Sequence, residues 1–185
     1  MQYFSFAKFG IPYMGVGRNL AYRKDVFYKV NGFIDHMHIN SGDDDLFINS
    51  VANKNNTALC YSPNSFTKSI PKLSFMTWFI QKRRHISTAK HYKLLHKLLL
   101  AEFYSSQFLF WLLSIILMVV NVKLTIILPL FIFTVIIKYL IFGYASKKLN
   151  ETDLIIFIPF LELFLIFIQF SIFISNLVSK PKHWK

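Results

Sequence analysis

Residues Tyr104 to Val120 read YSSQFLFWLLSIILMVV and contain no charged side chain. Two further apolar runs follow, at Leu124–Tyr144 and Leu154–Val178. A helix needs about 20 apolar residues to cross the hydrocarbon core of a bilayer. A soluble core could bury one such helix, but three in succession predict an all-α transmembrane region over residues 98–185, which ends in a short basic tail.

Residues 1–97 have an ordinary mixed composition and carry much of the positive charge. The 185-residue chain has a formal charge of +12, and 14 of its 21 Lys and Arg residues lie in this part. Six of them fall within Gln81–Lys97, which contains no acid. Because Lys and Arg that flank a span favour the cytoplasmic side, we expect residues 1–97 to be cytoplasmic and the chain to be a multi-pass protein of the cytoplasmic (inner) membrane. The tail, residues 179–185, is also basic, so either it departs from this rule or one span is re-entrant or interfacial.

The cytoplasmic part combines helical and extended patterns. One helix is predicted within KDVFYKVNGF, residues 24–33, and another begins at the acids of SGDDDLF, residues 41–47. Short strands are predicted at Asn19–Tyr22 and Ala58–Tyr61, and an amphipathic interfacial helix near residues 72–97. A mixture of helices and strands predicts an α/β domain for residues 1–97.

Three carboxylates stand side by side in SGDDDLF, at Asp43, Asp44 and Asp45. Backbone N–H groups at a helix start favour negative charge, so a solvated helix cap is one interpretation. An EF-hand is excluded because the twelfth position from Asp43 is Lys54 and the sixth is not glycine. Mg²⁺ binding by the Asp43 and Asp45 pair, or proton removal by one of the carboxylates, both remain open.

A second polar motif, QKRRH at residues 81–85, precedes the first apolar run. Basic residues beside a membrane span most often contact anionic lipid headgroups, and this membrane setting argues against nucleic-acid binding. The arrangement is nevertheless specific, because Gln81 is followed after two residues by Arg84 and then by the ring of His85. His36 and His38, by contrast, are interpreted as loop residues.

The order SGDDDLF, then QKRRH about 35 residues later, then membrane helices resembles the C-terminal part of a membrane-bound family 2 glycosyltransferase. This group includes cellulose synthases and poly-N-acetylglucosamine synthases. The stretch GVGRNLAYRKDVFYKVNGF, residues 15–33, resembles the segment before the catalytic acid in that family. The resemblance implies a GT-A, Rossmann-like fold and inverting transfer of a hexose from a nucleotide sugar. Residues 1–97 would form the acceptor side of that catalytic domain.

The resemblance also implies roles for individual residues. Aligning the family's x-Asp-Leu motif on Asp45 and Leu46 makes Asp43 the general base, whereas aligning on the glycine favours Asp44, which is kept as the second choice. Four residues would lie at the donor diphosphate and the acceptor: Gln81, Arg83, Arg84 and His85. Three would form an acceptor-side loop: Gly17, Arg18 and Asn19.

Two departures from the family pattern are informative. His85 stands where the family has Trp, which favours the transfer of one or a few sugars over processive synthesis, and Gly42 stands where it has Glu. The family's nucleotide-binding Asp and metal-binding Asp-x-Asp precede this region, and nothing in residues 1–40 matches them. We therefore expect the donor-binding half, with the ligands of the Mg or Mn ion that the family uses, to lie outside this chain.

The partners implied by the resemblance are a nucleotide sugar such as a UDP-sugar, a glycan or lipid-linked acceptor, and membrane lipids, but no nucleic acid. The alternative is a small non-catalytic membrane protein. In that case the basic segment beside the membrane would bind anionic lipid or a partner subunit.

Overall fold

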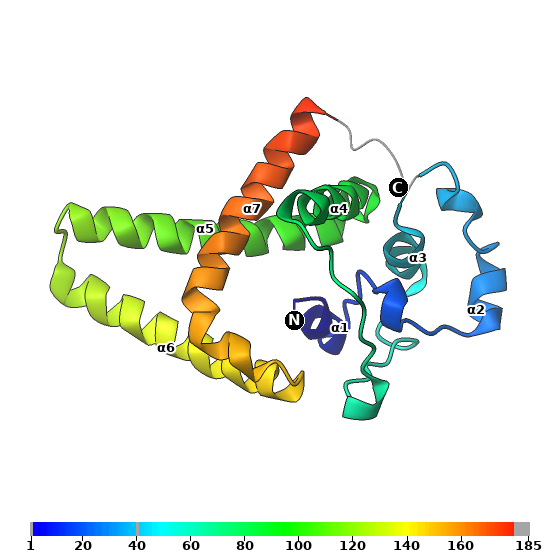
Figure 1. Ribbon diagram of the computed structural model, residues 1–185, viewed down its shortest axis with the longest axis horizontal. Helices are drawn as coiled ribbons and strands as arrows, with labels where there is room; N and C mark the ends of the chain where they lie inside the picture. Colours follow the sequence, from blue (N-terminus) through cyan, green and yellow to red (C-terminus); the bar gives the residue numbers. More distant parts are fainter. Residues whose placement is uncertain (1, 40, 180–185) are drawn as a thin grey trace. The chain divides into compact units, whose positions relative to one another are not determined.

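The computed structural model describes residues 2–39 and 41–179, and all regular secondary structure in this part of the chain is helical (Figure 1). The basic tail, residues 180–185, lies outside the described residues. The predicted α/β domain is therefore wrong, since the described residues contain no strand.

The two predicted strands fail for a common physical reason. Asn19 ends a short 3-10 helix, η1 (Gly17–Asn19), and residues 58–61 have no regular structure. Leu20 does have an extended backbone, with φ −129° and ψ 129°. A strand, however, needs a neighbour whose N–H and C=O groups complete the ladder. No other described segment provides one.

The chain divides by internal contacts into two compact units, residues 1–97 with 171–185 and residues 98–170. Helices α5 (Leu94–Val119) and α7 (Ile158–Val178) each have residues in both units. The other helices of the first unit are short: α1 (Gln2–Lys8), η1, α2 (Lys24–Lys29), η2 (Ile34–His36), α3 (Asp43–Val51), η3 (Pro63–Ser65), α4 (Phe75–Ser87) and η4 (Thr88–His91). The segment predicted as one interfacial helix thus contains α4, η4 and the start of α5.

Phe47 of α3 is the centre of an aromatic cluster in the first unit. Its side chain has 0% exposed surface. The ring centroids of Tyr22, Phe27 and Phe33 lie 4.7, 5.9 and 5.9 Å from that of Phe47. Burying rings of this size is among the largest favourable contributions that a small core can have. The cluster therefore fixes α3 and, with it, the three acids at its start.

The predicted helix within residues 24–33 is confirmed as α2, and its end explains how Phe27 enters this cluster. The chain leaves the helix through Asn31 and Gly32, whose φ angles are 55° and 66°. Such left-handed residues end helices, and glycine adopts them without steric cost. A Cβ on Gly32 would lie 2.6 Å from the Phe27 ring, so no other residue type leaves that ring in place.

The second unit contains most of α5, all of α6 (Leu124–Lys148) and η5 (Thr152–Phe157), and the first part of α7. Three helical segments are long and apolar enough to cross a membrane: Leu94–Val119, Leu124–Lys148 and Thr152–Val178. The prediction of about three such helices is thus confirmed, and they indicate a multi-pass membrane protein. Helix α5 begins earlier than the apolar run at Tyr104.

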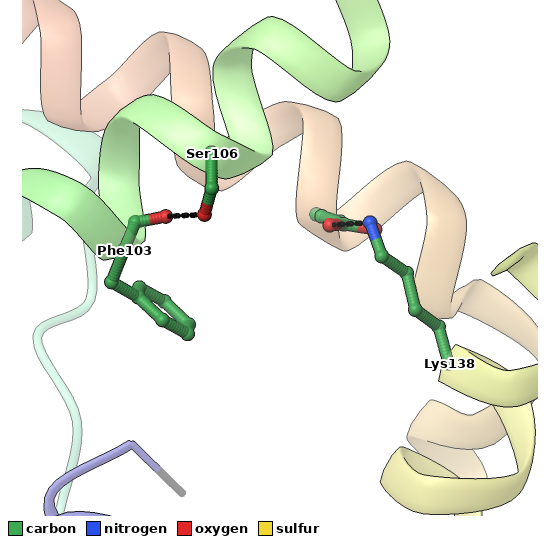
Figure 2. Close-up of polar contacts among 4 residues, drawn as sticks. Phe103, Ser106 and Lys138 are labelled. Atoms are coloured by element: carbon green, nitrogen blue, oxygen red, sulfur yellow. Dashed lines mark hydrogen bonds and ion pairs between the residues drawn. The ribbon is translucent and has the colours of Figure 1, made fainter.

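Several polar groups in these apolar helices have partners within the same unit. The hydroxyl of Ser106 donates to the carbonyl oxygen of Phe103 at 2.9 Å, and Figure 2 shows this contact beside the ion pair of Lys138. In that pair the ammonium of Lys138 lies 2.6 Å from the carboxylate of Glu162, which is 7% exposed. The Lys138 ammonium also lies 4.1 Å from the centroid of the Phe110 ring. Charge that faces lipid is costly, and this pairing reduces the cost.

Candidate functional site

The acidic motif forms the first turn of α3, as its sequence predicts. Gly42 precedes the helix with φ 93°, in the left-handed region that favours glycine. A Cβ there would lie 2.5 Å from Asp45 Oδ1 and 2.7 Å from Thr88 Cγ2. Gly42 therefore permits a close approach between the start of α3 and the segment that follows α4. The glycine that departs from the family pattern has a clear structural reason in this chain.

The three acids of this turn have three different environments. Asp43 is exposed, and its carboxylate has no hydrogen-bond partner among residues 2–39 and 41–179. Asp44 is half-buried and accepts hydrogen bonds from the backbone amides of Gly17 and Asp45, at 2.7 and 2.8 Å. Its orientation is therefore fixed, whereas the carboxylate of Asp43 is solvated.

Asp45 is buried and connects α3 to residues beyond the basic motif. Its Oδ2 accepts hydrogen bonds from the hydroxyls of Thr88 and Tyr92, at 2.6 and 2.5 Å. Its Oδ1 is buried and has no hydrogen-bond partner within the described part of the chain. Burial raises the pKa of Asp45, although the two hydroxyl donors oppose that shift. The burial and the two donors give Asp45 a structural position that is closed to a substrate.

The basic motif lies in the second half of α4, whose start is capped by Ser74. The Ser74 hydroxyl accepts a hydrogen bond from the backbone amide of Thr77 at 3.3 Å. Positions three and four apart share one side of a helix, so Gln81, Arg84 and His85 lie on the same face. The helix that Ser74 caps therefore holds Gln81, Arg84 and His85 next to one another on one face.

The pKa of His85 is affected by charges from both the basic and the acidic motif. Burial lowers the pKa of His85, and the positive charges of Arg84 and Lys82 lower it further. The negative charges of Asp44 and Asp45 act in the opposite direction. His85 is thus within electrostatic reach of both acids. The two motifs, about 35 residues apart in the sequence, therefore lie near each other in the first unit, as the hydrogen bond from Thr88 to Asp45 also indicates.

Arg83 has a different environment from Arg84. Its guanidinium donates to the carbonyl oxygens of Ser175 and Ser179, at 2.8 and 2.6 Å, and to Asn176 Oδ1 at 3.1 Å. The amide of Asn176 donates in return to the carbonyl oxygen of Arg83 at 3.2 Å. Carbonyl groups at a helix end lack partners within the helix, and a cation there also faces the negative end of the helix dipole. Arg83 therefore binds the C-terminal end of α7.

The predicted acceptor-side loop forms η1 and faces the segment before α4. Arg18 donates to the hydroxyl of Ser69 at 2.5 Å, and the amide of Asn19 donates to the carbonyl oxygen of Ser65 at 3.0 Å. An open groove of about 590 Å³ lies next to these contacts. Its lining consists of Arg18, residues 70–74, Thr77 and Gln81. The loop and the basic helix thus share one groove.

Sequence reasoning missed a second polar network, which is centred on Asn49. The Asn49 amide donates to the carbonyl oxygen of Tyr13 at 2.8 Å and lies 2.8 Å from His96 Nδ1. Its side-chain oxygen accepts from the backbone amide of Lys93 at 3.0 Å. Asn49 follows Asp45 by four residues, so both face the same partner segment. The four-residue spacing in the sequence could have indicated that Asp45 and Asn49 share a buried helix face. It could not have identified Tyr13, Lys93 and His96 as the partners of Asn49.

The described residues do not fit a metal ion. No three His, Cys, Asp or Glu side chains within residues 2–39 and 41–179 come together as metal ligands do. The Asp43 and Asp45 pair considered for Mg²⁺ is divided between solvent and a closed contact with Thr88 and Tyr92. Asp43 and Asp45 therefore do not present their carboxylates to one shared ion.

The described residues combine three candidate membrane spans with an acidic helix start that contacts the segment after a basic helix. A family model described as Glycosyl transferase family group 2 matches residues 1–168, and the chain belongs to this family. The resemblance drawn from SGDDDLF and QKRRH is thus confirmed. None of the curated proteins or solved structures compared matches the chain. Membership implies a sugar donor, an acceptor and a transferase class in which divalent cations are common.

Proposed function

We propose that this protein takes part in inverting transfer of a hexose from a nucleotide sugar to a glycan or lipid-linked acceptor. In this reaction the acceptor hydroxyl oxygen bonds to the anomeric carbon while the bond from that carbon to the diphosphate breaks. The hydroxyl proton passes to a carboxylate, and the nucleoside diphosphate leaves with the electron pair. The observation that carries the proposal is the approach of the SGDDDLF motif to the segment that follows QKRRH, where Thr88 donates to Asp45 at 2.6 Å, in a chain of this family.

We assign the general base to Asp44 and place Asp43 second, which reverses the order that the Asp-Leu alignment favours. A base must be held within hydrogen-bond reach of the proton that it removes. Two backbone amides hold Asp44, whereas the Asp43 carboxylate is solvated. Each carboxylate oxygen has two lone pairs, so Asp44 can bind these amides and still accept a proton. Asp45 supports the site by joining α3 to Thr88 and Tyr92.

Arg84 is proposed to stabilise the charge that grows on the leaving diphosphate. A guanidinium offers several donors in a fixed fork that suits phosphate oxygens. Stabilising charge in the transition state is usually a large part of catalysis. Arg84 is half-buried on the same face of α4 as Gln81, which lines the groove beside Arg18. We assign this groove to the acceptor side and His85 to its border.

The cytoplasmic face of the inner membrane is the proposed location of this reaction, with a UDP-sugar as donor. The Lys and Arg residues of Gln81–Lys97 support that orientation, because they precede the apolar part of α5. The Mg or Mn ion that the family uses would be held outside the described residues. Membrane lipids would surround the three apolar helices.

A gene deletion tests whether the protein supports such a reaction. Membranes are isolated from wild-type cells, from the deletion strain and from the deletion strain complemented with Arg84→Ala. They are then incubated with radiolabelled nucleotide sugars, and label in lipid and polymer fractions is counted. We expect the deletion to abolish one transfer activity, wild-type complementation to restore it, and Arg84→Ala to restore little of it.

Lys82→Gln is the matched control, because it removes a positive charge from the neighbouring exposed side of α4. We expect it to restore most of the activity. If the deletion changes no nucleotide-sugar-dependent product, the transferase proposal fails. The alternative hypothesis would then be preferred, in which the protein is not an enzyme and its basic segment binds anionic lipid or a partner subunit.

A further inference from the structure

A small pocket lined by several titratable side chains lies in the first unit, and the proposed reaction uses none of its residues. Its volume is about 240 Å³. Pockets for drug-sized ligands usually measure about 300–1,000 Å³, so this one suits a small group. The pocket is formed by η2 and the residues after it, by α3, and by the junction of η4 and α5. The charged and titratable side chains that line it are Asp35, His36, His38, His91 and Lys93.

The side chain of Asn49, which lines the pocket, already has hydrogen-bond partners. Asn49 is 3% exposed, and its amide and its oxygen are taken up by Tyr13, His96 and Lys93. The ammonium of Lys93 donates to the carbonyl oxygen of Ser50 at 3.1 Å, which holds it at the wall. An ammonium has three donors, so two of them remain available to a ligand. Lys93 therefore provides a positive charge in a defined position at the pocket.

The electrostatics of the pocket favour an anion. Burial lowers the pKa of His91, and the positive charges of Lys90, His38, Lys97 and His36 lower it further, in that order. The one acid that lines the pocket, Asp35, is outnumbered by these groups. Three imidazoles and an ammonium could suggest a metal site, but the described residues form no metal-binding group. An anion would relieve the repulsion among the cations.

We propose that this pocket binds a phosphate group, held by Lys93 and by the side chains of His36, His38 and His91. A phosphate has several oxygens and so can accept from all of these donors at once, and charge-assisted hydrogen bonds of this kind are the strong ones. Because the histidines must be protonated to act as donors on both ring nitrogens, binding takes up protons and strengthens as the pH falls. This site is separate from the proposed transfer reaction and does not depend on it.

The phosphate group has two possible sources, a soluble phosphate compound and a membrane lipid. Lys93 directly precedes α5, the first of the three candidate spans. Lysine and arginine beside a span commonly contact anionic headgroups. A phosphomonoester lipid would present the same chemistry as inorganic phosphate, so an experiment has to separate the two sources.

The test uses the full chain with isotope-labelled histidine side chains, reconstituted in lipid nanodiscs. In one arm the nanodiscs contain phosphatidylcholine alone, and inorganic phosphate is added at about pH 6 and about pH 8. In the other arm the nanodiscs contain phosphatidic acid, and no phosphate is added. His96 does not line the pocket but reports on its surroundings, because its Nδ1 lies 2.8 Å from the side-chain amide of Asn49.

We expect the NMR signals of His36, His38 and His91 to shift in at least one arm, and to shift more than those of His96. A rise of one unit in a histidine pKa on binding corresponds to an affinity about tenfold higher at the lower pH. Shifts with inorganic phosphate identify a soluble source, and shifts only with phosphatidic acid identify a lipid source. Lys93→Gln and His91→Gln should weaken binding, whereas the control Lys68→Gln, which changes an exposed lysine elsewhere in the first unit, should not. The proposal is overturned if no histidine responds in either arm, or if Lys68→Gln weakens binding as much as Lys93→Gln does.

Discussion

The carboxylate of Asp44 accepts a hydrogen bond from the backbone amide of Gly17 at 2.7 Å. This contact joins the start of α3 to η1, although the two residues are 27 positions apart in the sequence. It holds the proposed base against the loop that we assign to the acceptor side. The acidic motif and the glycine turn, which the sequence offers as separate features, thus belong to one site.

Gly17→Ala tests this relationship without removing the amide. The new Cβ would lie 3.1 Å from Asp44 Oδ2 and 3.3 Å from Asp44 Cβ, so the carboxylate must shift by a few tenths of an ångström. Displacing a catalytic group by about 1 Å can cost about 10²-fold in rate. We expect transfer by membranes of the variant to fall several-fold, up to about that limit. Gly143→Ala is the control, because its Cβ would make an ordinary contact of 3.8 Å. Equal activity of both variants would contradict the role of the Gly17 contact.

The buried carboxyl of Asp45 predicts a pH-dependent stability. Burial raises its pKa above the ordinary Asp value of about 3.9, so the folded state holds this proton more tightly than the unfolded state does. Its contribution to stability is therefore complete below about pH 4 and is lost as the pH rises through the folded pKa. We expect the apparent Tm of the chain in detergent to show this decline, and Asp45→Asn to reduce it.

Tyr92→Phe provides the opposing control for this pH effect. It removes a hydroxyl that donates to Asp45 Oδ2 at 2.5 Å and so disfavours the charged carboxylate further. A hydrogen bond to a charged group is worth about 1.5–3 kcal/mol. We expect Tyr92→Phe to extend the loss of stability to higher pH and so to make the total loss larger. A decline that neither substitution alters would show that Asp45 is not its source.

Arg83 is expected to stabilise the end of α7 and not to bind the donor. Arg83→Gln should lower the apparent Tm and speed amide hydrogen exchange at Ser175–Ser179, because it removes the donors to the α7 carbonyl oxygens. The donor KM, measured in membranes at a temperature where the variant is folded, should change little. Lys82→Gln should leave exchange at Ser175–Ser179 unchanged. A large rise in donor KM for Arg83→Gln, without faster exchange, would show instead that Arg83 contributes to binding the donor diphosphate.

The Lys138 and Glu162 pair predicts non-additive stability effects in the second unit. Removing one partner of a buried ion pair leaves an uncompensated charge and costs about 3–5 kcal/mol, whereas replacing both costs much less. We expect Lys138→Met and Glu162→Gln each to lower the apparent Tm in nanodiscs, and the double variant to recover part of the loss. Ser106→Ala is a mild control, since it removes a hydroxyl that donates to a carbonyl oxygen of its own helix (Figure 2). Strictly additive losses would show that the two charges do not interact.

The sequence predicts the apolar helices, the acidic helix start and the stop of α2 correctly because each depends on local patterns. Tyr104–Val120 is a run of neighbours, and the left-handed residues at Asn31 and Gly32 act within one turn. The α/β prediction failed because a strand depends on a distant partner, and residues 58–61 look extended whether or not one exists.

The candidate site divides in the same way. Spacing alone puts Gln81, Arg84 and His85 on one face of a helix. It cannot tell which of three adjacent acids is buried, because Asp45 differs from Asp43 only through Thr88 and Tyr92, more than 40 residues away. Nor can it separate Arg83 from Arg84, since the partners of Arg83 lie 92 to 96 positions along the chain. Long-range contacts decided each of these roles.

Paired chromosomal substitutions test most directly whether Asp44 is the general base. Membranes from cells that carry Asp44→Asn or Asp43→Asn are assayed for nucleotide-sugar-dependent transfer, with the amount of protein equalised and donor binding measured in parallel. Loss of a general base costs about 10²–10⁴-fold in rate. We predict a loss of this size for Asp44→Asn with donor binding retained, and near-normal transfer for Asp43→Asn. Full activity of Asp44→Asn, with loss in Asp43→Asn, would contradict the assignment.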